Sequence, residues 1–298
     1  MEIDARQLAC LLTIAQHGSF SRAATHRRLS QPALSRTISQ LERALGARVL
    51  ERGRFGAKLN SLGTALVRHA EAIQVQLSRA REEAELYRDH VDGQLIVGVT
   101  PITAAELVPH AISRLIARRP NASIRIVELP FERGRAALKR GEIDVYVGPL
   151  QQLGESSDLL EETIFADPLC VVVSPKHPLA SRRSIQLKEL SHCSWALPIG
   201  SNALLRQLQA LFLTASLPYP QAAVTTDSML TLKGIVKYSN LITIFPRALV
   251  RLECVVGELH AIKLSNAGNS RIVGVALSPD RPMSPLAEHF IQSLRVAK

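Results

Sequence analysis

The chain has 298 residues, enough for two or three domains with sizeable hydrophobic cores. Apolar residues make up 46% of it and charged residues 21%, which excludes an intrinsically disordered protein. The net charge of +10 fits an acidic polymer as partner. No stretch approaches the roughly 18 apolar residues that a membrane span needs, and the N-terminal residues do not resemble a signal peptide. We therefore expect a cytoplasmic protein with no membrane partner.

The N-terminal region predicts three helices. Residues 4–17 form the first, because apolar residues recur at helical spacing, namely Leu8, Leu11, Leu12 and Ala15. The second contains Ala23 and Ala24, which are small enough for another helix to approach closely. The third begins at Ser30, a good N-cap, has Pro32 in its first turn and ends at Gly46. Its buried face is expected to consist of Leu34, Ile38, Leu41 and Leu45.

The opposite face of this third helix is polar and consists of Gln31, Ser35, Arg36, Ser39, Gln40 and Arg43. Side chains of these types read base edges and phosphates in the major groove of DNA. Nine basic and two acidic residues fall within 19–58, so this segment carries +7 of the net +10. Residues 52–58 add glycines for a turn and basic side chains for the phosphate backbone. The alternative is a solvated basic helical hairpin without a partner, which leaves the one-sided polar pattern unexplained.

Three strings in this region resemble the N-terminal domain of the LysR-type transcriptional regulators: FSRAA at 20–24, LSQPALSRTISQLERALGARVLERG at 29–53 and LNSLG at 59–63. Asn60-Ser61 departs from the family pattern, which usually has Thr followed by a small or acidic residue, but Asn is itself a good N-cap. The resemblance implies a winged helix-turn-helix domain at 1–60 that binds double-stranded DNA at a palindromic operator. The expected DNA-binding residues are Ser30, Gln31, Pro32, Ser35, Arg36, Ser39, Arg52, Arg54 and Lys58.

Residues 61–90 contain no proline and no glycine after Gly63, which predicts one long helix. An apolar seam runs along it, formed by Leu62, Leu66, Ile73, Leu77, Ala84 and Tyr87. A helix of this length with a narrow seam is expected to pair with a second copy of itself. The resemblance likewise implies a linker helix through which two subunits dimerise. It also implies a tetramer, with RNA polymerase as a candidate partner.

From Gly93 onward, predicted strands and helices alternate, which favours an α/β domain with parallel strands. Strands are predicted at 93–100, 123–129, 143–147, 170–173, 194–197, 222–225, 241–244 and 272–277, and helices at 104–117, 133–140, 202–215, 228–238 and 284–297. This pattern resembles the periplasmic-binding-protein-like effector domain of the same family. The expected fold class is thus α/β: a winged helix-turn-helix, a long linker helix and an effector domain at 91–298. Its two α/β subdomains would be 91–168 plus 270–298, and 169–269.

In open α/β sheets, ligands bind beyond the carboxyl ends of strands, near helix N-termini. Three such turns are 100–103, 198–202 and 226–228, and the resemblance implies that they line a cleft between the subdomains. A small, anionic effector bound there would control activity. The expected effector-binding residues are Thr100, Pro101, Thr103, Pro149, Ile199, Gly200, Ser201, Asp227, Ser228 and Phe245.

Several of these assignments have alternatives. Thr103, Ser201 and Ser228 would also fit as ordinary helix caps. Arg247 is either a charge partner for the effector or a surface residue. Small aromatic acids, sugar acids, amino-acid relatives and sulfonates are all candidate effectors.

Three other functions compete with this interpretation. An enzyme is disfavoured, because the sequence has no G-x-S-x-G, no H-E-x-x-H and no glycine-rich phosphate loop, and its nine histidines are scattered. A secreted solute-binding protein would not explain the basic N-terminal domain. A thiol redox sensor would need two cysteines that meet or one activated thiol, which the sequence leaves open for Cys193 and Cys254. The four cysteines lack metal-ligand spacing and fit buried thiols in a reducing cytoplasm, so we expect no metal and no cofactor.

Overall fold

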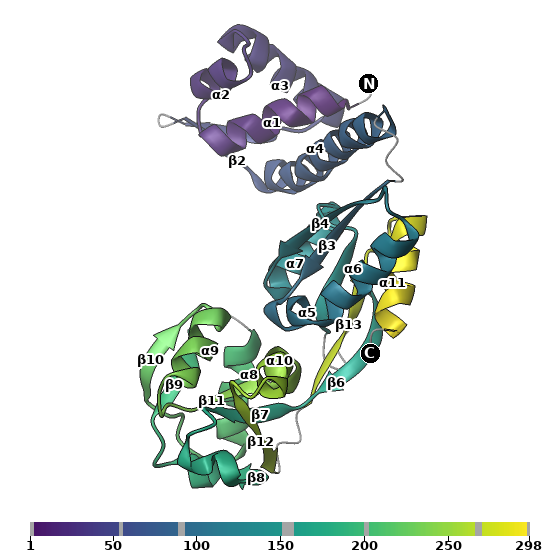
Figure 1. Ribbon diagram of the computed structural model, residues 1–298. Helices are drawn as coiled ribbons and strands as arrows, with labels where there is room; N and C mark the ends of the chain where they lie inside the picture. Colours follow the sequence, from purple (N-terminus) through teal and green to yellow (C-terminus); the bar gives the residue numbers. More distant parts are fainter. Residues whose placement is uncertain are drawn as a thin grey trace. The chain divides into compact units, whose positions relative to one another are not determined.

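The structure is a computed structural model that describes residues 3–53, 56–88, 93–150, 158–199, 203–265 and 270–296. The chain divides into two compact units, Met1–Asp89 and His90–Lys298, which we call unit 1 and unit 2 (Figure 1). Each has its own hydrophobic core. Among the helices in the described ranges, none is long and apolar enough to cross a membrane.

Unit 1 begins with three helices, α1 (Ala5–His17), α2 (Phe20–His26) and α3 (Gln31–Leu45). The Asp4 side chain caps α1 by accepting a hydrogen bond from the Gln7 N–H at 2.8 Å, and α1 ends at Gly18, whose φ is +65°. Ser30 caps α3 in the same way, because its Oγ accepts from the Ala33 N–H at 3.3 Å. The N-cap predicted at Ser30 and the stop predicted at Gly46 are therefore confirmed.

The core of unit 1 lies between these helices. The predicted inner face of α3 is buried at Leu34, Ile38 and Leu41, while Leu45 is half-buried. These side chains pack with Ala23 and Ala24 of α2 and with the apolar face of α1. Because Ala23 and Ala24 are small, α2 can pack closely against α1 and α3. Since α3 buries its apolar face in this core, its polar face is directed toward solvent.

A short hairpin and a long helix complete unit 1. Strands β1 (Leu50–Gly53) and β2 (Gly56–Leu59) are antiparallel, and α4 (Ser61–Arg88) follows. Asn60 joins them: its Oδ1 accepts from the Gly63 N–H at 2.8 Å, and its Nδ2 donates to the Arg48 carbonyl at 2.7 Å. The Asn that departs from the family pattern therefore caps α4.

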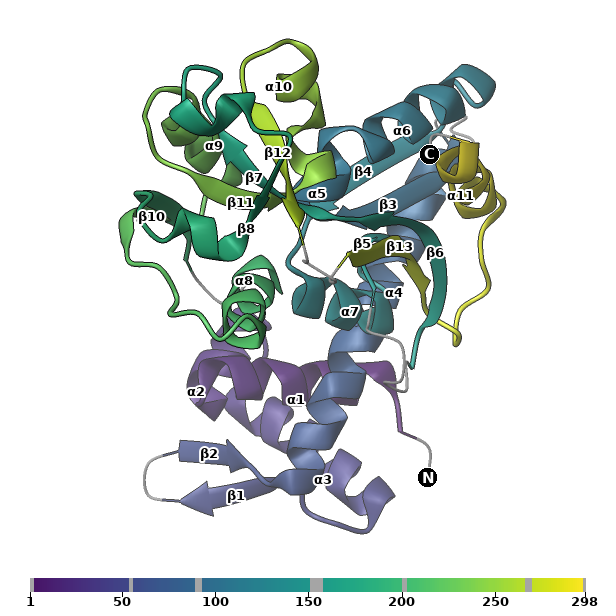
Figure 2. The same cartoon turned by 90° about the horizontal axis from the view of Figure 1, so that it is seen from below.

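Helix α4 packs across α1 (Figure 2). Leu62, Leu66 and Ile73 of the predicted seam contact the core of unit 1, together with the buried Ala70. The first half of this seam therefore has partners within the chain, and Leu62, Leu66 and Ile73 are half-buried by them. Pairing of the seam with a second copy remains a prediction. Leu77, further along, is 49% exposed, and the side chain of Tyr87 lies outside the described residues.

Unit 2 contains two α/β lobes. The first lobe has a five-stranded sheet in the order β4-β3-β5-β13-β6. Its strands are β3 (Gln94–Val99), β4 (Ser123–Glu128), β5 (Val145–Pro149), β6 (Leu160–Asp167) and β13 (Arg271–Leu277). The first three are parallel, whereas β13 is antiparallel to both of its neighbours.

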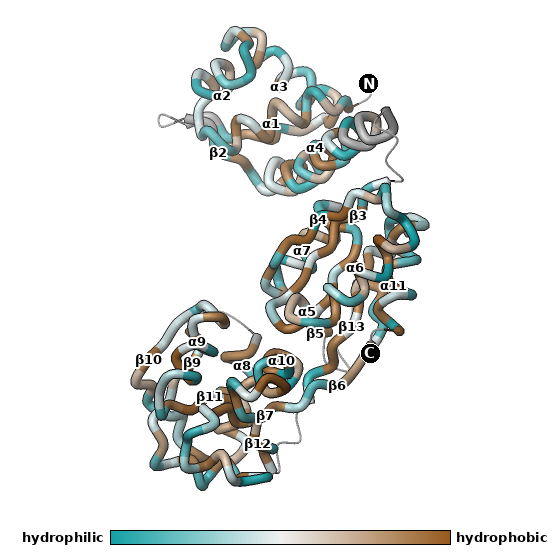
Figure 3. Tube along the Cα trace, in the orientation of Figure 1, coloured by the Kyte–Doolittle hydropathy of each residue, from teal (hydrophilic) through white to brown (hydrophobic). Residues whose placement is uncertain are grey.

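Helices cover both faces of this sheet. Helices α6 (Leu107–Arg118) and α11 (Pro285–Val296) contact each other on one face, and α7 (Phe131–Arg140) lies on the other (Figures 1 and 2). The short α5 (Pro101–Ala105) follows β3 directly. Burial on both faces explains why the central strands are almost wholly hydrophobic, as Figure 3 shows.

The second lobe has a four-stranded sheet in the order β11-β7-β12-β8 and a parallel pair of strands, β9 and β10. The strand bounds are β7 (Leu169–Val173), β8 (Ser184–Gln186), β9 (Trp195–Pro198), β10 (Ala222–Thr226), β11 (Thr243–Pro246) and β12 (His260–Ser265). The helices are α8 (Ala203–Thr214), α9 (Met229–Lys237) and α10 (Arg251–Val255), with short 3-10 helices η1 (Pro178–Ser181), η2 (Leu187–Leu190) and η3 (Arg247–Val250). The chain enters this lobe at Pro168, between β6 and β7, and leaves it between β12 and β13.

Candidate nucleic-acid interface and ligand cleft

The polar face of α3 is the first candidate site. Gln31, Pro32 and Arg36 are exposed, and Ser35 and Ser39 are half-buried beside them. The Ser30 hydroxyl is engaged in capping, so its part in any interface would be to fix the start of the helix. A helix that buries one face and presents short polar and forked basic groups on the other has the form that enters a major groove.

The hairpin and the other arginines of unit 1 differ in what they can contribute. Lys58 is exposed on β2, opposite Glu51 in the ladder. Arg54 and the side chain of Arg52 lie outside the described residues. Arg27 turns inward: its guanidinium donates to the Ala9 carbonyl and to Thr13 Oγ1, both at 3.2 Å. It therefore ties α2 to α1.

The second candidate site is a cavity of about 670 Å³ in unit 2, which we call the ligand cleft. Both lobes contribute to its wall, α5 and α7 from the first and α8, α9 and η3 from the second. Five of the predicted residues line it: Thr100, Pro101, Pro149, Ile199 and Asp227. Gly200 and Ser201 lie outside the described residues.

Three predicted residues have other roles. Thr103 is fully buried, and its hydroxyl donates to the Val147 carbonyl at 2.7 Å, so it joins α5 to β5. Phe245 is fully buried in the second-lobe core. Both belong to the interior, which corrects their assignment to the cleft wall. Ser228 caps α9 by accepting from the Thr231 N–H at 3.2 Å, the alternative role that the sequence offered.

Charged residues that the sequence did not single out also line the ligand cleft: Glu128, Glu132, Arg133, Arg206 and Arg271. Arg271 is the first residue of β13. Burial lowers the pKa of its guanidinium, with Tyr146 and Asp167 acting in the opposite direction. No carboxylate of the described residues lies within ion-pair distance of the Arg271 guanidinium. The cleft thus holds a largely desolvated cation. The apolar part of its wall is formed by Ile102, Leu129, Pro130, Phe131, Leu204, Met229 and Leu249.

The position of Arg271 has a geometric explanation. The rule that ligands bind at the carboxyl ends of strands does not predict Arg271, because this residue is at the amino end of its strand. However, β13 runs antiparallel to β5, with Val273 opposite Pro149. The amino end of β13 therefore lies beside the carboxyl end of β5, at the same edge of the sheet.

Contacts between the lobes lie around the cleft. Arg206 of α8 is 3.7 Å from Glu132 of α7, and Arg251 of α10 is 2.5 Å from Glu106, at the start of α6. At the crossover into the second lobe, Asp167 Oδ1 accepts from the Ala248 N–H of η3 at 3.1 Å. The two lobes are thus joined by hydrogen bonds and ion pairs. Some of these are exposed to solvent and therefore contribute little individually.

Burial raises the pKa of all four cysteine thiols, Cys10, Cys170, Cys193 and Cys254, that of Cys170 to about 12. A redox-sensing thiol is activated by a lowered pKa, so these environments speak against the sensor alternative. Within the described ranges, no cluster of three or more histidine, cysteine or acidic side chains could hold a metal ion.

A helix-turn-helix with a basic hairpin, followed by a two-lobed α/β unit with a cavity between its lobes, defines a DNA-binding regulator that carries a ligand-binding domain. The chain belongs to the LysR family of transcriptional regulators. Residues 5–64 match the family described as bacterial regulatory helix-turn-helix protein, lysR family, and residues 88–297 match the LysR substrate binding domain. The protein is accordingly a regulator that binds DNA and responds to an effector, and not an enzyme.

Similar proteins agree with this placement. The chain is 29% identical to the HTH-type transcriptional regulator GbpR of Azospirillum brasilense, over 98% of this chain and 86% of that protein. It is also 29% identical to the SDS degradation transcriptional activation protein of a Pseudomonas species, over 96% and 93% of the two chains. A full-length OxyR variant from Pseudomonas aeruginosa has a TM-score of 0.66 at 25% identity, covering 99% of this chain and 96% of the other. CbnR complexed with its target DNA shares the fold, with a TM-score of 0.69 at 17% identity over 99% and 100% of the chains.

Proposed function

We propose that the effector of this regulator is a small anion with an apolar body, held in the ligand cleft with its charge at Arg271. The observation that carries the proposal is the largely desolvated Arg271 guanidinium in the wall of a cavity that also has an extended apolar part. No carboxylate of the described residues forms an ion pair with this largely buried cation. The cation therefore favours an anionic ligand, because the ligand replaces the water that burial removes.

The other lining residues support the same ligand class. Thr100 offers a hydroxyl that can donate or accept, and the apolar residues around it suit a ring or a short chain. Arg206, paired at 3.7 Å with Glu132, stands on the opposite lobe as a second cation. Among the candidates from the sequence, aromatic acids and sulfonates fit this lining best, and sugar acids least.

Thermal unfolding of the full-length protein with benzoate, phenylacetate and octanoate tests the proposal. A bound anion raises the melting temperature by mass action. Arg271→Gln is expected to weaken binding by about ten- to a hundredfold, since a hydrogen bond to a charged group is worth about 1.5–3 kcal/mol. Arg183→Gln removes an equal charge from an exposed site in the second lobe and is expected to leave binding unchanged. Anion binding that survives Arg271→Gln would overturn the assignment.

For DNA we infer that Gln31, Ser35 and Arg36 read bases, while Arg52, Arg54 and Lys58 hold the phosphate backbone. The exposure of Gln31 and Arg36 at the start of α3 supports this division, since the start of a recognition helix contacts bases. A palindromic operator would be read by a homodimer formed through the second half of α4, where Leu77 is exposed. Assembly into a tetramer, contact with RNA polymerase and a cytoplasmic location complete the proposal, and family membership supports them.

A further inference from the structure

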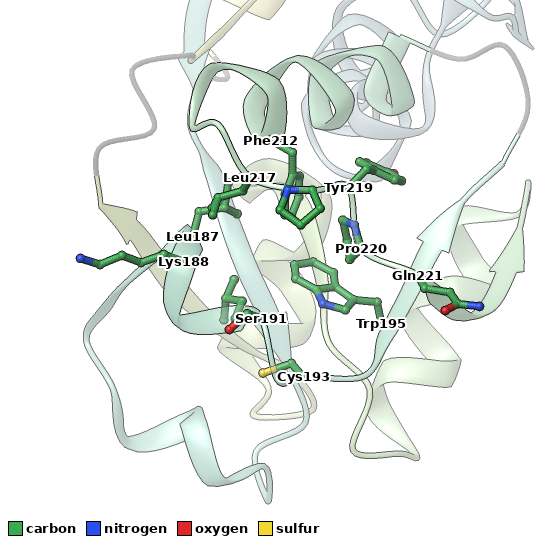
Figure 4. A pocket seen from close by; sticks show the side chains of 12 residues that line it. Leu187, Lys188, Ser191, Cys193, Trp195, Phe212, Leu217, Tyr219, Pro220 and Gln221 are labelled. Atoms are coloured by element: carbon green, nitrogen blue, oxygen red, sulfur yellow. The ribbon is translucent and has the colours of Figure 1, made fainter.

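The second lobe contains another cavity, of about 380 Å³, which we call the aromatic cavity (Figure 4). The segment from η2 to the start of β9 forms one side, and the end of α8 with the following loop forms the other. Its lining residues are Leu187, Lys188, Leu190, Ser191, Cys193, Trp195, Phe212, Leu217, Pro218, Tyr219, Pro220 and Gln221. None of these residues lines the ligand cleft, so the two cavities are separate.

Three aromatic rings fix the shape of the cavity. The Trp195 and Phe212 rings meet edge to face, with centroids 5.7 Å apart and planes at 73°. Phe212 and Tyr219 meet in the same way at 5.5 Å and 75°. Edge-to-face contacts of this kind are favourable and hold each ring in one orientation. The cavity is therefore bounded by flat, apolar surfaces that are already in place.

The Trp195 indole N–H is an unused hydrogen-bond donor in this wall. Trp195 is only 2% exposed, yet no described residue accepts a hydrogen bond from its nitrogen. Figure 4 shows this nitrogen on the ring edge nearer to Cys193. Among the described residues, this nitrogen does not belong to the fully buried polar atoms that lack a partner, so it is accessible from the cavity. An acceptor inside the cavity would therefore be able to take the hydrogen bond that the indole N–H offers.

The lining is close to neutral. Burial raises the pKa of both the Cys193 thiol and the Tyr219 hydroxyl, so both are protonated near pH 7. Among the lining residues that the structure describes, Lys188 alone is charged, and it is exposed. Unlike the ligand cleft, the aromatic cavity offers no desolvated cation to an anion.

We propose that the aromatic cavity is a second binding site, which takes a neutral, planar aromatic molecule that accepts a hydrogen bond from the Trp195 indole N–H. Its volume suits one ring with a small polar substituent. Helix α8 contributes to both cavities: Leu204 and Arg206 line the ligand cleft, and Phe212 lines the aromatic cavity. Strand β9 begins with Trp195 in the aromatic cavity and is followed by Ile199 in the ligand cleft.

The chain has a single tryptophan, so Trp195 itself can report on the site. We would titrate full-length protein labelled with fluorotryptophan with benzamide and follow its one fluorine NMR resonance. Benzamide has a flat ring, no charge and a carbonyl acceptor, and it is expected to shift the resonance saturably. Benzoate, which has the same shape but a charge, is expected to bind at least tenfold more weakly here.

Two variants locate the binding. Leu217→Phe puts an extra ring into the cavity and is expected to abolish the shift. Leu213→Phe makes the same change at a residue of α8 that is 80% exposed and is expected to leave the shift intact. In Trp195→Phe, measured by ligand-observed NMR, benzamide affinity is expected to fall by roughly fivefold, the value of one neutral hydrogen bond.

The results that overturn the proposal are equally specific. If benzamide did not shift the fluorine resonance, the aromatic cavity would be a water-filled space and not a binding site. A shift that persists in Leu217→Phe would place the ligand elsewhere. Equal binding of benzoate and benzamide would refute the neutral ligand class. None of these outcomes depends on Arg271, so they do not affect the proposal for the ligand cleft.

Discussion

Asp167 and Arg271 are register partners in the antiparallel ladder of β6 and β13, so a buried carboxyl group lies next to the cation that lines the ligand cleft. Asp167 is 2% exposed, and burial raises its pKa to about 6, although backbone N–H donors and Arg271 oppose the rise. One of its oxygens, Oδ2, has no hydrogen-bond partner among the described residues. The charge on this carboxyl therefore changes within the physiological range of pH.

We expect Asp167→Asn to stabilise the protein near pH 7 and to have little effect near pH 4. The folded protein holds the Asp167 proton more tightly than the unfolded chain, in which aspartate titrates at about 3.9. The resulting stability is complete below about pH 4 and is lost as the pH rises through about 6. The amide oxygen of asparagine can still accept from the Ala248 N–H, so the lobe contact is kept.

The size of this effect is at most on the order of 3 kcal/mol near pH 7. The measurement is the melting temperature of the wild type and of Asp167→Asn across this pH range. The difference between the two proteins reports on Asp167 alone, because the other titrating groups contribute equally to both. A difference that does not vary with pH would contradict the prediction.

The same titration is expected to control ligand binding. Below about pH 6, Asp167 is neutral and Arg271 keeps its full attraction for an anion. Benzoate affinity should therefore rise by roughly three- to tenfold as the pH falls from about 7 to 5. Calorimetry measures this rise directly. Asp167→Asn is expected to bind benzoate tightly at both pH values, and a pH dependence that persists in this variant would assign the effect to another group.

On DNA, Gln31→Ala and Arg36→Ala are expected to reduce discrimination against mismatched operators by about 1–3 kcal/mol, because each removes a base contact. Lys58→Ala should instead weaken binding to all sequences alike and lower the slope against salt by about one counterion. Competition titrations with operator and random DNA at several salt concentrations separate the two effects. If Lys58→Ala changed discrimination while Arg36→Ala did not, the assignment of α3 as the reading element would be wrong.

For α4, the structure separates two leucines that the sequence placed in one seam. Leu66→Glu is expected to unfold unit 1, because Leu66 packs against its core. Leu77→Glu should leave unit 1 folded, because Leu77 is 49% exposed, and should shift dimers toward monomers. Circular dichroism and sedimentation distinguish these results. A Leu77→Glu protein that sediments as the wild type does would place the subunit contact elsewhere.

Local signals in the sequence were sufficient to predict the helices of unit 1. Ser30 and Gly46 mark the ends of α3, and its apolar face follows from helical spacing, because helix ends and faces depend on nearby residues. The fold class of unit 2 was predicted from alternating strands and helices. Strand β6 was missed, since it carries Glu161, Glu162 and Asp167 and has no clear apolar run.

The ligand cleft was only partly predictable, for reasons of topology. The turns after β3 and β9 follow the rule for parallel strands, and Thr100 and Ile199 line the cavity. Arg271 could not be inferred, because the direction of β13 is set by pairing with residues more than a hundred positions away. Thr103 was assigned wrongly, because a hydroxyl at a helix start looks the same in sequence whether it faces a cavity or the Val147 carbonyl.

The late position of β13 in the chain has a consequence for synthesis. This strand is the last in sequence, yet it lies between β5 and β6. The first-lobe sheet therefore cannot close until the ribosome has passed Leu277, whereas unit 1, which has its own core, is complete at Asp89. A product of premature termination before β13 would keep the DNA-reading face of α3 but lack Arg271. Such a fragment would be able to occupy DNA without being able to answer an effector.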